Sequence, residues 1–344
     1  MADQMTSRER VLNLLNGKPV DRIPCFSGLG NVTVKGLEDH GIKFSKVHDD
    51  PVGLANAAAS SYKLYGYECA VVPFDLCLEA EVLGCTMNPY DHLQDLLYPT
   101  IKEKSYPKLE DIKVPDKLET LGRVPVLLEA GRKLQEDIGK DVAIGTYLLG
   151  PFTLAGQCLD LEPLIKSSIK KPNELIAYLD KMADIQIAFA KVLLQDGPFD
   201  FLTIREMGAT CDILSPRIFK KVIMGPLKKI FDNIPKPNIL HICGGTTPIL
   251  EMMMECGPGA ISIDSKTSMK EAREKLGPDA VILGNFNAFN LLINAGADET
   301  KTTIQQLITE GASGIHPGCD IWPTAKEENM MALVEACKSS GNGS

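Results

Sequence analysis

The sequence predicts an α/β fold, a (β/α)8 TIM barrel preceded by an N-terminal helical extension. Short apolar runs alternate with longer amphipathic segments, a pattern typical of parallel strands joined by crossover helices. Eight such runs follow one another along the chain, which is the strand number of this barrel. A length of 344 residues with 44% hydrophobic content is enough to bury one large core.

The N-terminal extension is a helix predicted over about residues 6–16. Thr6 and Glu9 have the spacing of a capping box, in which each residue bonds a backbone N–H at the start of the helix. Gly17 and Pro19 are expected to end the helix, because glycine and proline follow helix ends far more often than they continue them.

The strand candidates are short apolar runs bounded by turn-forming residues. They cover residues 22–28, 69–75, 142–150, 200–208, 238–245, 260–265, 280–287 and 314–320. Helical patterns are clearest in the second half, at residues 173–195, 216–233, 247–256, 268–276 and 299–311. The Pro- and charge-rich stretch 99–125 is predicted to be a long surface excursion. With no repeat or linker, residues 1–344 are expected to form one barrel domain with a disordered tail at about 339–344.

A doubly wound open sheet is the main alternative to the barrel. Such a sheet would normally carry a glycine-rich, phosphate-binding turn after an early strand. The stretch FSGLGNVTVKG, residues 26–36, has glycines but lacks the third glycine that opens the helix in that motif. The barrel is therefore the preferred fold.

Composition excludes several classes of function. A net charge of −9 argues against a protein that tracks nucleic-acid phosphates. The apolar runs are far shorter than the roughly 20 residues of a membrane span. Ten cysteines without close pairing, and no secretory leader, indicate a reducing cytoplasm.

A possible metal site lies at the carboxyl ends of two predicted strands. His241 and Cys243 are two residues apart, so a strand directs both side chains to one face. Cys319 ends the eighth strand, and a barrel brings all strand ends to one mouth. Two thiolates and one imidazole suit zinc, and three protein ligands leave the fourth position that catalytic zinc needs. The alternative is that His241 and Cys243 are only buried polar residues, and His316 is expected to support the site rather than to bind metal.

Eight segments spread over nearly the whole chain carry a family resemblance. They are GKPVDRIP (17–24), VPFDLCLEAEVLGC (72–85), GPFTLAG (150–156), SIKKPNEL (168–175), CDILSPRIF (211–219), LHICGGTTPIL (240–250), EAREKLGPDAVILGNFNAF (271–289) and GIHPGCDIWP (314–323). Together they resemble the uroporphyrinogen decarboxylase superfamily, and within it the methylcobamide:coenzyme M methyltransferases. This branch has an H-x-C motif and a distant third cysteine as zinc ligands, which His241, Cys243 and Cys319 match.

The resemblance implies a zinc-dependent methyltransferase of the kind used in methanogenesis. A methyl group would pass between a methyl-corrinoid, carried by a separate corrinoid-binding protein, and a small-molecule thiol such as coenzyme M. A free thiol is mostly protonated at neutral pH, and coordination to zinc converts it into the nucleophilic thiolate.

Other polar residues at strand ends are candidates for the same site. Glu206 and Asp264 could fill the open zinc position before substrate binds, or could instead cap loops. Asn285 and Asn287 could orient substrate, although the stretch GNFN also suits a turn. Asp75 falls where the decarboxylases keep an essential aspartate, so it is a candidate for substrate binding. His40, His48 and His92 are expected at the surface.

Three alternatives remain open. The stretches SGLGN (27–31) and REMGATCD (205–212) depart from the thiol-methylating pattern. The first alternative is therefore an O-demethylase, which passes the methyl group of a methoxylated substrate to Co(I). Glu206 would act as the acid in that reaction. Decarboxylation is less expected, because residues 24–34 lack the arginines that would neutralise a porphyrin's carboxylates. The last alternative is a non-catalytic barrel that keeps zinc for stability.

Overall fold

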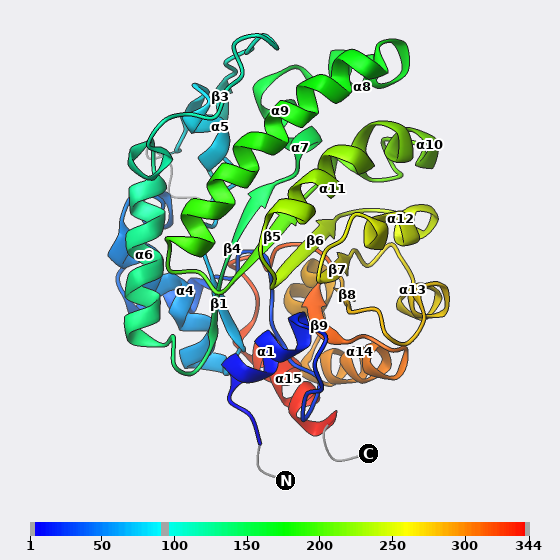
Figure 1. The fold of residues 1–344 in the computed structure, drawn as a ribbon. Coiled ribbons are helices and arrows are strands. Elements are labelled where there is room, and N and C mark those ends of the chain that lie inside the picture. The colour runs from blue at the N-terminus through cyan, green and yellow to red at the C-terminus, as the bar shows by residue number, and fades with distance from the viewer. Residues whose placement is uncertain (1–3, 91–95, 341–344) are drawn as a thin grey trace.

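The computed structural model describes residues 4–90 and 96–340. Seven strands form one parallel sheet in the order β1-β4-β5-β6-β7-β8-β9, curled so that helices surround it (Figure 1). This arrangement confirms the predicted barrel class. The strands are β1 (Cys69–Val71), β4 (Ala143–Leu149), β5 (Phe201–Arg205), β6 (Asn238–Ile242), β7 (Ala260–Ile263), β8 (Ile282–Phe286) and β9 (Gly314–Pro317).

The first predicted strand, at residues 22–28, is reduced to a bridge that joins the two edges of the sheet. Cys25 pairs in parallel with Ile315 of β9, and its carbonyl accepts a hydrogen bond from the N–H of Glu68, just before β1, at 2.9 Å. The ladder stays short because Pro24 has no N–H to donate and because the N–H of Ser27 donates to the Cys69 sulfur instead of a neighbouring strand. The segment still completes the ring between β9 and β1.

Helices cover the outside of the sheet and agree with the predicted positions in the second half of the chain. The α-helices are α1 (Ser7–Leu15), α2 (Val34–Asp39), α3 (Phe44–Val47), α4 (Pro51–Tyr65), α5 (Leu78–Val82), α6 (Val124–Asp137), α7 (Pro151–Cys158), α8 (Leu161–Lys170), α9 (Pro172–Ala190), α10 (Pro216–Ile218), α11 (Met224–Asn233), α12 (Leu250–Glu255), α13 (Met269–Leu276), α14 (Ala297–Thr309) and α15 (Glu327–Ser339). Short 3₁₀ and π segments are η1 (Leu118–Thr120), η2 (Lys191–Gln195), η3 (Met207–Ala209), η4 (Phe219–Ile223), η5 (Thr247–Ile249) and η6 (Asn290–Asn294).

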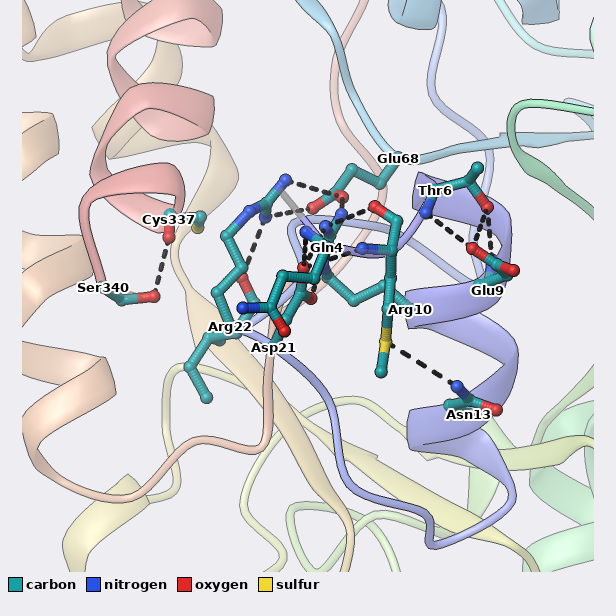
Figure 2. A network of polar contacts seen from close by, with 12 residues as sticks. Gln4, Thr6, Glu9, Arg10, Asn13, Asp21, Arg22, Glu68, Cys337 and Ser340 are labelled. Carbon is teal, nitrogen blue, oxygen red and sulfur yellow. Dashed lines mark hydrogen bonds and ion pairs between the residues drawn. The ribbon is translucent and has the colours of Figure 1, made fainter. Parts of the chain in front are cut away.

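Helix α1 lies against the amino-terminal end of the barrel (Figure 1). The predicted capping box is confirmed, since the Glu9 N–H donates to the Thr6 hydroxyl while the Thr6 N–H donates to the Glu9 carboxylate. Val11 and Leu15 are fully buried on the inner face of the helix. Arg10 is also buried, and its guanidinium binds the Glu68 carboxylate in a network of charged side chains (Figure 2). The extension therefore closes the bottom of the barrel.

The excursion at 99–125 is more ordered than predicted. Its first residues form β3 (Thr100–Glu103), which pairs antiparallel with β2 (Thr86–Asn88). His92 and most of the predicted tail, 341–344, lie outside the described residues. Within the described ranges, no helix has both the length and the apolar character needed to cross a bilayer.

Candidate functional site

Strand curvature brings the three predicted metal ligands together at the carboxyl ends of β6 and β9. His241 Nε2 lies 3.0 Å from Cys243 Sγ, and Cys243 Sγ lies 3.9 Å from Cys319 Sγ. His241 is fully buried, Cys243 is half-buried and Cys319 is exposed. The three donor atoms thus run from the barrel interior to its surface, where an incoming molecule can reach the sulfurs.

One of these spacings, the separation of the two sulfurs, is close to the separation that zinc requires. Tetrahedral zinc with Zn–S bonds of about 2.3 Å separates two sulfurs by about 3.8 Å, close to the Cys243–Cys319 separation. In the residues that the structure describes, no group of three or more His, Cys, Asp or Glu side chains is assembled as a ready metal site. His241, Cys243 and Cys319, called the trio below, are therefore a set of candidate ligands and not a formed coordination shell. The Cys243 thiol donates a hydrogen bond to the Cys319 sulfur, and this bond lowers the pKa of the Cys319 thiol.

A layer of polar side chains beneath the trio fixes the His241 ring. His241 Nδ1 lies 2.9 Å from the hydroxyl of Ser262 on β7, and this hydroxyl is 3.2 Å from His316 Nδ1. His316 Nε2 must accept, because its partner is the N–H of Gly28 at 2.8 Å, so its proton sits on Nδ1 and is donated to the Pro317 carbonyl. His316 is thus a supporting residue, as its position in the sequence suggested.

Both imidazoles are held in the neutral form. Burial, and after it the charge of Arg205, hold the pKa of His241 well below its usual value, and burial lowers the pKa of His316 to about 4. A neutral imidazole with Nδ1 directed at Ser262 leaves Nε2 available, which is the arrangement usual for histidine ligands of zinc. Ser262 was missed by the sequence analysis, although it shares a strand face with Asp264.

Arg205 reaches the mouth of the barrel beside the trio. Its guanidinium binds both carboxylate oxygens of Asp320, at 3.0 and 2.6 Å, and lies 4.7 Å from the centre of the Tyr147 ring. Asp320 directly follows Cys319, so this ion pair fixes the loop that carries the third candidate ligand. Arg205 is only 1% exposed. Arg205 and the next residue, Glu206, point in opposite directions, and Arg205 is the one that reaches the loop of Cys319.

Glu206 faces outward and caps α7. Its carboxylate accepts hydrogen bonds from the N–H groups of Phe152 and Thr153, at 2.9 and 2.8 Å, and from the Thr153 hydroxyl at 2.6 Å. Burial raises its pKa to about 7, although these three bonds oppose the shift. All the bonds to this carboxylate come from α7, so the structure associates Glu206 with a helix end and not with the trio.

The other candidates hold the loops after β7 and β8. Asp264 accepts from the N–H of Lys266 and stabilises its own turn. Asn285 donates to the carbonyls of Asp264 and Thr267, which ties β8 to that turn. Asn287 is exposed and accepts from the N–H of Asn290 at the start of η6. These contacts are of the loop-capping kind considered as the alternative to substrate binding.

Asp75 lies in a buried ionic cluster next to the mouth. Two bonds from Arg123, at 2.7 and 2.9 Å, and one from the N–H of Cys77 hold its carboxylate. Burial alone would raise the pKa of Asp75, but His48 and Arg123 together hold it far below its usual value. His48 is 3.2 Å from Asp75 and only 4% exposed. The surface position predicted for His48 was wrong, because α3 packs the ring inward against this charge; His40 is exposed as predicted.

Comparison with known proteins agrees with this architecture. The family model for uroporphyrinogen decarboxylase (URO-D) matches residues 6–340. The chain belongs to the URO-D family.

Its relatives within the URO-D family include methyltransferases of methanogens. The chain is 31% identical to the methylcobamide:CoM methyltransferase MtaA of Methanosarcina barkeri (strain Fusaro) over 335 residues, covering 97% of this chain and 98% of the relative. It is 30% identical to MtbA of Methanosarcina mazei, covering 98% of each protein. A solved methyltransferase structure from M. mazei superposes with a TM-score of 0.92, at 31% identity and 98% coverage of this chain. The predicted resemblance to this branch of the URO-D family is confirmed.

Proposed function

We propose that this protein is a zinc-dependent methyltransferase that moves a methyl group between a methyl-corrinoid protein and a thiol such as coenzyme M. The observation that carries the proposal is the convergence of His241, Cys243 and Cys319 at the barrel mouth. Full-length similarity to methylcobamide:CoM methyltransferases supports the same chemistry.

Each part of the site has a role in this proposal. Zinc held by the trio would supply the Lewis acidity that keeps a thiol substrate in its thiolate form at neutral pH. Ser262 holds His241 in the orientation that offers Nε2 to the metal. The bidentate Arg205–Asp320 pair holds the loop of Cys319. Since Cys319 is exposed, the substrate sulfur and the methyl group on cobalt can approach each other from outside the barrel.

The thiol acceptor is preferred over a methoxylated donor for a structural reason. The O-demethylase alternative uses Glu206 as the acid toward a departing phenolate, and this carboxylate is occupied by three donors from α7. A further relative, 28% identical, is named a methylated-thiol–coenzyme M methyltransferase, which also favours sulfur chemistry.

The test is a panel of substrates with the purified, zinc-loaded protein. Coenzyme M and other thiols are mixed with free methylcobalamin, and methoxylated aromatics with cob(I)alamin, while the cobalt spectrum is followed. We expect methylcobalamin to become cob(I)alamin when coenzyme M is added. Methylation of cob(I)alamin by an aryl ether, without any reaction of thiols, would overturn the proposal in favour of O-demethylation.

Cysteine variants separate catalytic zinc from structural zinc. Cys319→Ser should lose zinc and at least 100-fold in rate while its melting temperature changes little, because catalytic sites contribute less to folding than structural ones. Cys211→Ser is the matched control, since Cys211 is half-buried in the loop after β5 but is not one of the trio. Collapse of the Cys319→Ser fold would point instead to a stabilising metal.

A further inference from the structure

Large apolar side chains are exposed on segments that follow the carboxyl ends of the strands. Phe289 follows β8 and is 48% exposed, and Trp322 follows β9 and is 51% exposed. Leu161, Ile169 and Ile213, which follow β4 and β5, are also exposed. Singly exposed apolar residues are ordinary on protein surfaces, whereas exposed apolar residues that contact one another mark a surface that another molecule covers. Helices α8 and α10, in the segments after β4 and β5, lie at the end of the barrel away from α1 (Figure 1).

Two of these side chains form a defined aromatic pair. The rings of Phe289 and Trp322 lie 6.1 Å apart at 77°, an edge-to-face arrangement. This geometry is favourable by itself, so the two rings hold each other in place while half of each surface faces water. Trp322 is the only tryptophan in the chain.

The backbone beneath Trp322 is fixed on both sides. Asp320 is bound by Arg205, and Ile321 is fully buried and bridges to Asn31. The Pro323 carbonyl accepts the N–H of Val34 at 2.7 Å. The exposed indole is therefore presented by a rigid segment, three residues beyond Cys319, and not by a loose loop.

We propose that Phe289 and Trp322 form a platform that receives the corrin ring of the methyl donor; this inference rests on the proposed function and names the binding surface of that same site. The methyl group sits on one face of a flat macrocycle and must approach a sulfur held beside Cys319. The ring therefore spreads over the rim next to Cys319, and Trp322 lies three residues beyond this cysteine in the chain. The edge of the corrin ring carries methyl groups, which make favourable contacts with aromatic surfaces. Because the two rings already hold each other in place, they lose little conformational entropy when the ligand binds.

Steady-state kinetics with free methylcobalamin test the platform. Trp322→Ala should raise the KM for methylcobalamin about 10-fold, and Phe289→Ala about 3- to 10-fold, as for aromatic anchors at interfaces. The KM for the thiol, the zinc content and kcat at saturating donor should change less than about 2-fold. Trp322→Phe should restore most of the affinity, because it retains an aromatic face. Met331→Ala is the matched control, since Met331 is 45% exposed on α15.

The lone tryptophan gives a second readout that needs no turnover. Hydroxocobalamin absorbs where tryptophan emits, so a corrin ring seated on Trp322 should quench its fluorescence, with a midpoint that Phe289→Ala raises at least 3-fold. A tryptophan amide measured in parallel corrects for absorption of light by the ligand. Quenching with this dependence, in a protein that methylates no thiol, would support the platform while the proposed function fails.

Three results would overturn the platform. One is a wild-type fluorescence that stays constant at methylcobalamin concentrations that saturate turnover. Another is a pair of aromatic variants whose KM for free methylcobalamin equals that of Met331→Ala. A defect seen only with a protein-bound corrinoid would have the same consequence, because it would assign the pair to a protein surface and not to the ring.

Discussion

At the scale of single residues, the Ser262 hydroxyl organises the polar layer under the candidate metal ligands. It is within hydrogen-bonding distance of both His241 and His316. Groups that orient a ligating histidine typically contribute 10- to 100-fold to metal affinity. We expect Ser262→Ala to weaken zinc binding by about that factor, measured by competition with a chelator.

Ser265→Ala is the control for this prediction. Ser265 follows the same strand, is exposed, and donates to its neighbour Asp264. Its zinc affinity should match that of the wild type. Equal affinities in all three proteins would mean that Ser262 has no part in orienting His241.

Glu79, a buried acid that is not one of the candidate metal ligands, makes the stability of the fold depend on pH. Burial raises its pKa from 4.5 to about 7, against the opposing hydrogen bond from the Leu149 N–H. An acid whose pKa is higher in the folded protein stabilises the fold fully at pH values below its pKa in the unfolded state. This contribution is lost as the pH rises through the folded-state pKa of about 7. Glu79→Gln keeps an acceptor for Leu149 but cannot ionise.

We therefore expect Glu79→Gln to equal the wild type at pH 5 and to exceed its unfolding free energy by about 1–3 kcal/mol at pH 8. Urea unfolding at the two pH values measures this difference. Glu162→Gln, on the exposed side of α8, should follow the wild type at both. A variant less stable than the wild type at pH 8 would show that the charged form of Glu79 stabilises the fold.

The placement of side chains was predictable from the sequence where geometry is forced. His241 and Cys243 had to share a face because of the two-residue period, and barrel closure had to bring Cys319 near them. The inward position of Arg205 depends on strand registration within the barrel, which local sequence does not encode. The burial of His48 depends on its contact with Asp75, a residue in a different segment, and could not be seen from the sequence around it.

At the scale of secondary structure, Glu206, which directly follows β5, caps the first turn of α7. Glu206 accepts from the N–H groups of Phe152 and Thr153, which lack partners inside the helix. Glu206→Ala should lower the unfolding free energy by about 2–4 kcal/mol, because buried donors are left without acceptors. Thermal and urea unfolding measure the loss.

Zinc affinity distinguishes this capping role from a role in chemistry. It should be unchanged in Glu206→Ala, since the carboxylate faces α7. Glu162→Ala, in the exposed first turn of α8, should cost less than about 0.5 kcal/mol. If Glu206→Ala kept full stability but lost zinc or activity, the assignment of Glu206 to the catalytic site would be the better one.

Elements were predictable in proportion to their length and periodicity. The long pattern at 173–195 corresponds to α9 and η2, which together span Pro172–Gln195. Residues 22–28 have strand composition, but the proline and the diverted N–H groups leave only one bridge. The pairing of β2 with β3 inside the excursion depends on a contact between two very short segments, and neither has a local pattern strong enough to predict it.

At the scale of the whole molecule, ring closure positions the site at one end and a charged network secures the other. Glu68, just before β1, accepts from Arg10 of α1, from Arg22 at 2.8 and 3.0 Å, and from the N–H of Cys25 at 2.8 Å. Asp21 binds Arg10 as well. Figure 2 shows these side chains converging between α1 and the barrel. The network joins the N-terminal extension, the closing segment and the first strand.

Glu68→Gln should lower the unfolding free energy by about 3–5 kcal/mol, because it leaves two buried guanidinium groups with one carboxylate fewer. The exposed pair Lys63–Asp137 provides the control: both side chains are 43% exposed, so Asp137→Asn should cost less than about 1 kcal/mol. Urea unfolding compares the two variants, and zinc binding by the folded protein should be normal in each, since the network lies at the opposite end of the barrel from Cys319. Equal stabilities would show that α1 is held by its apolar face alone, with the arginines able to find other partners when Glu68 is neutral.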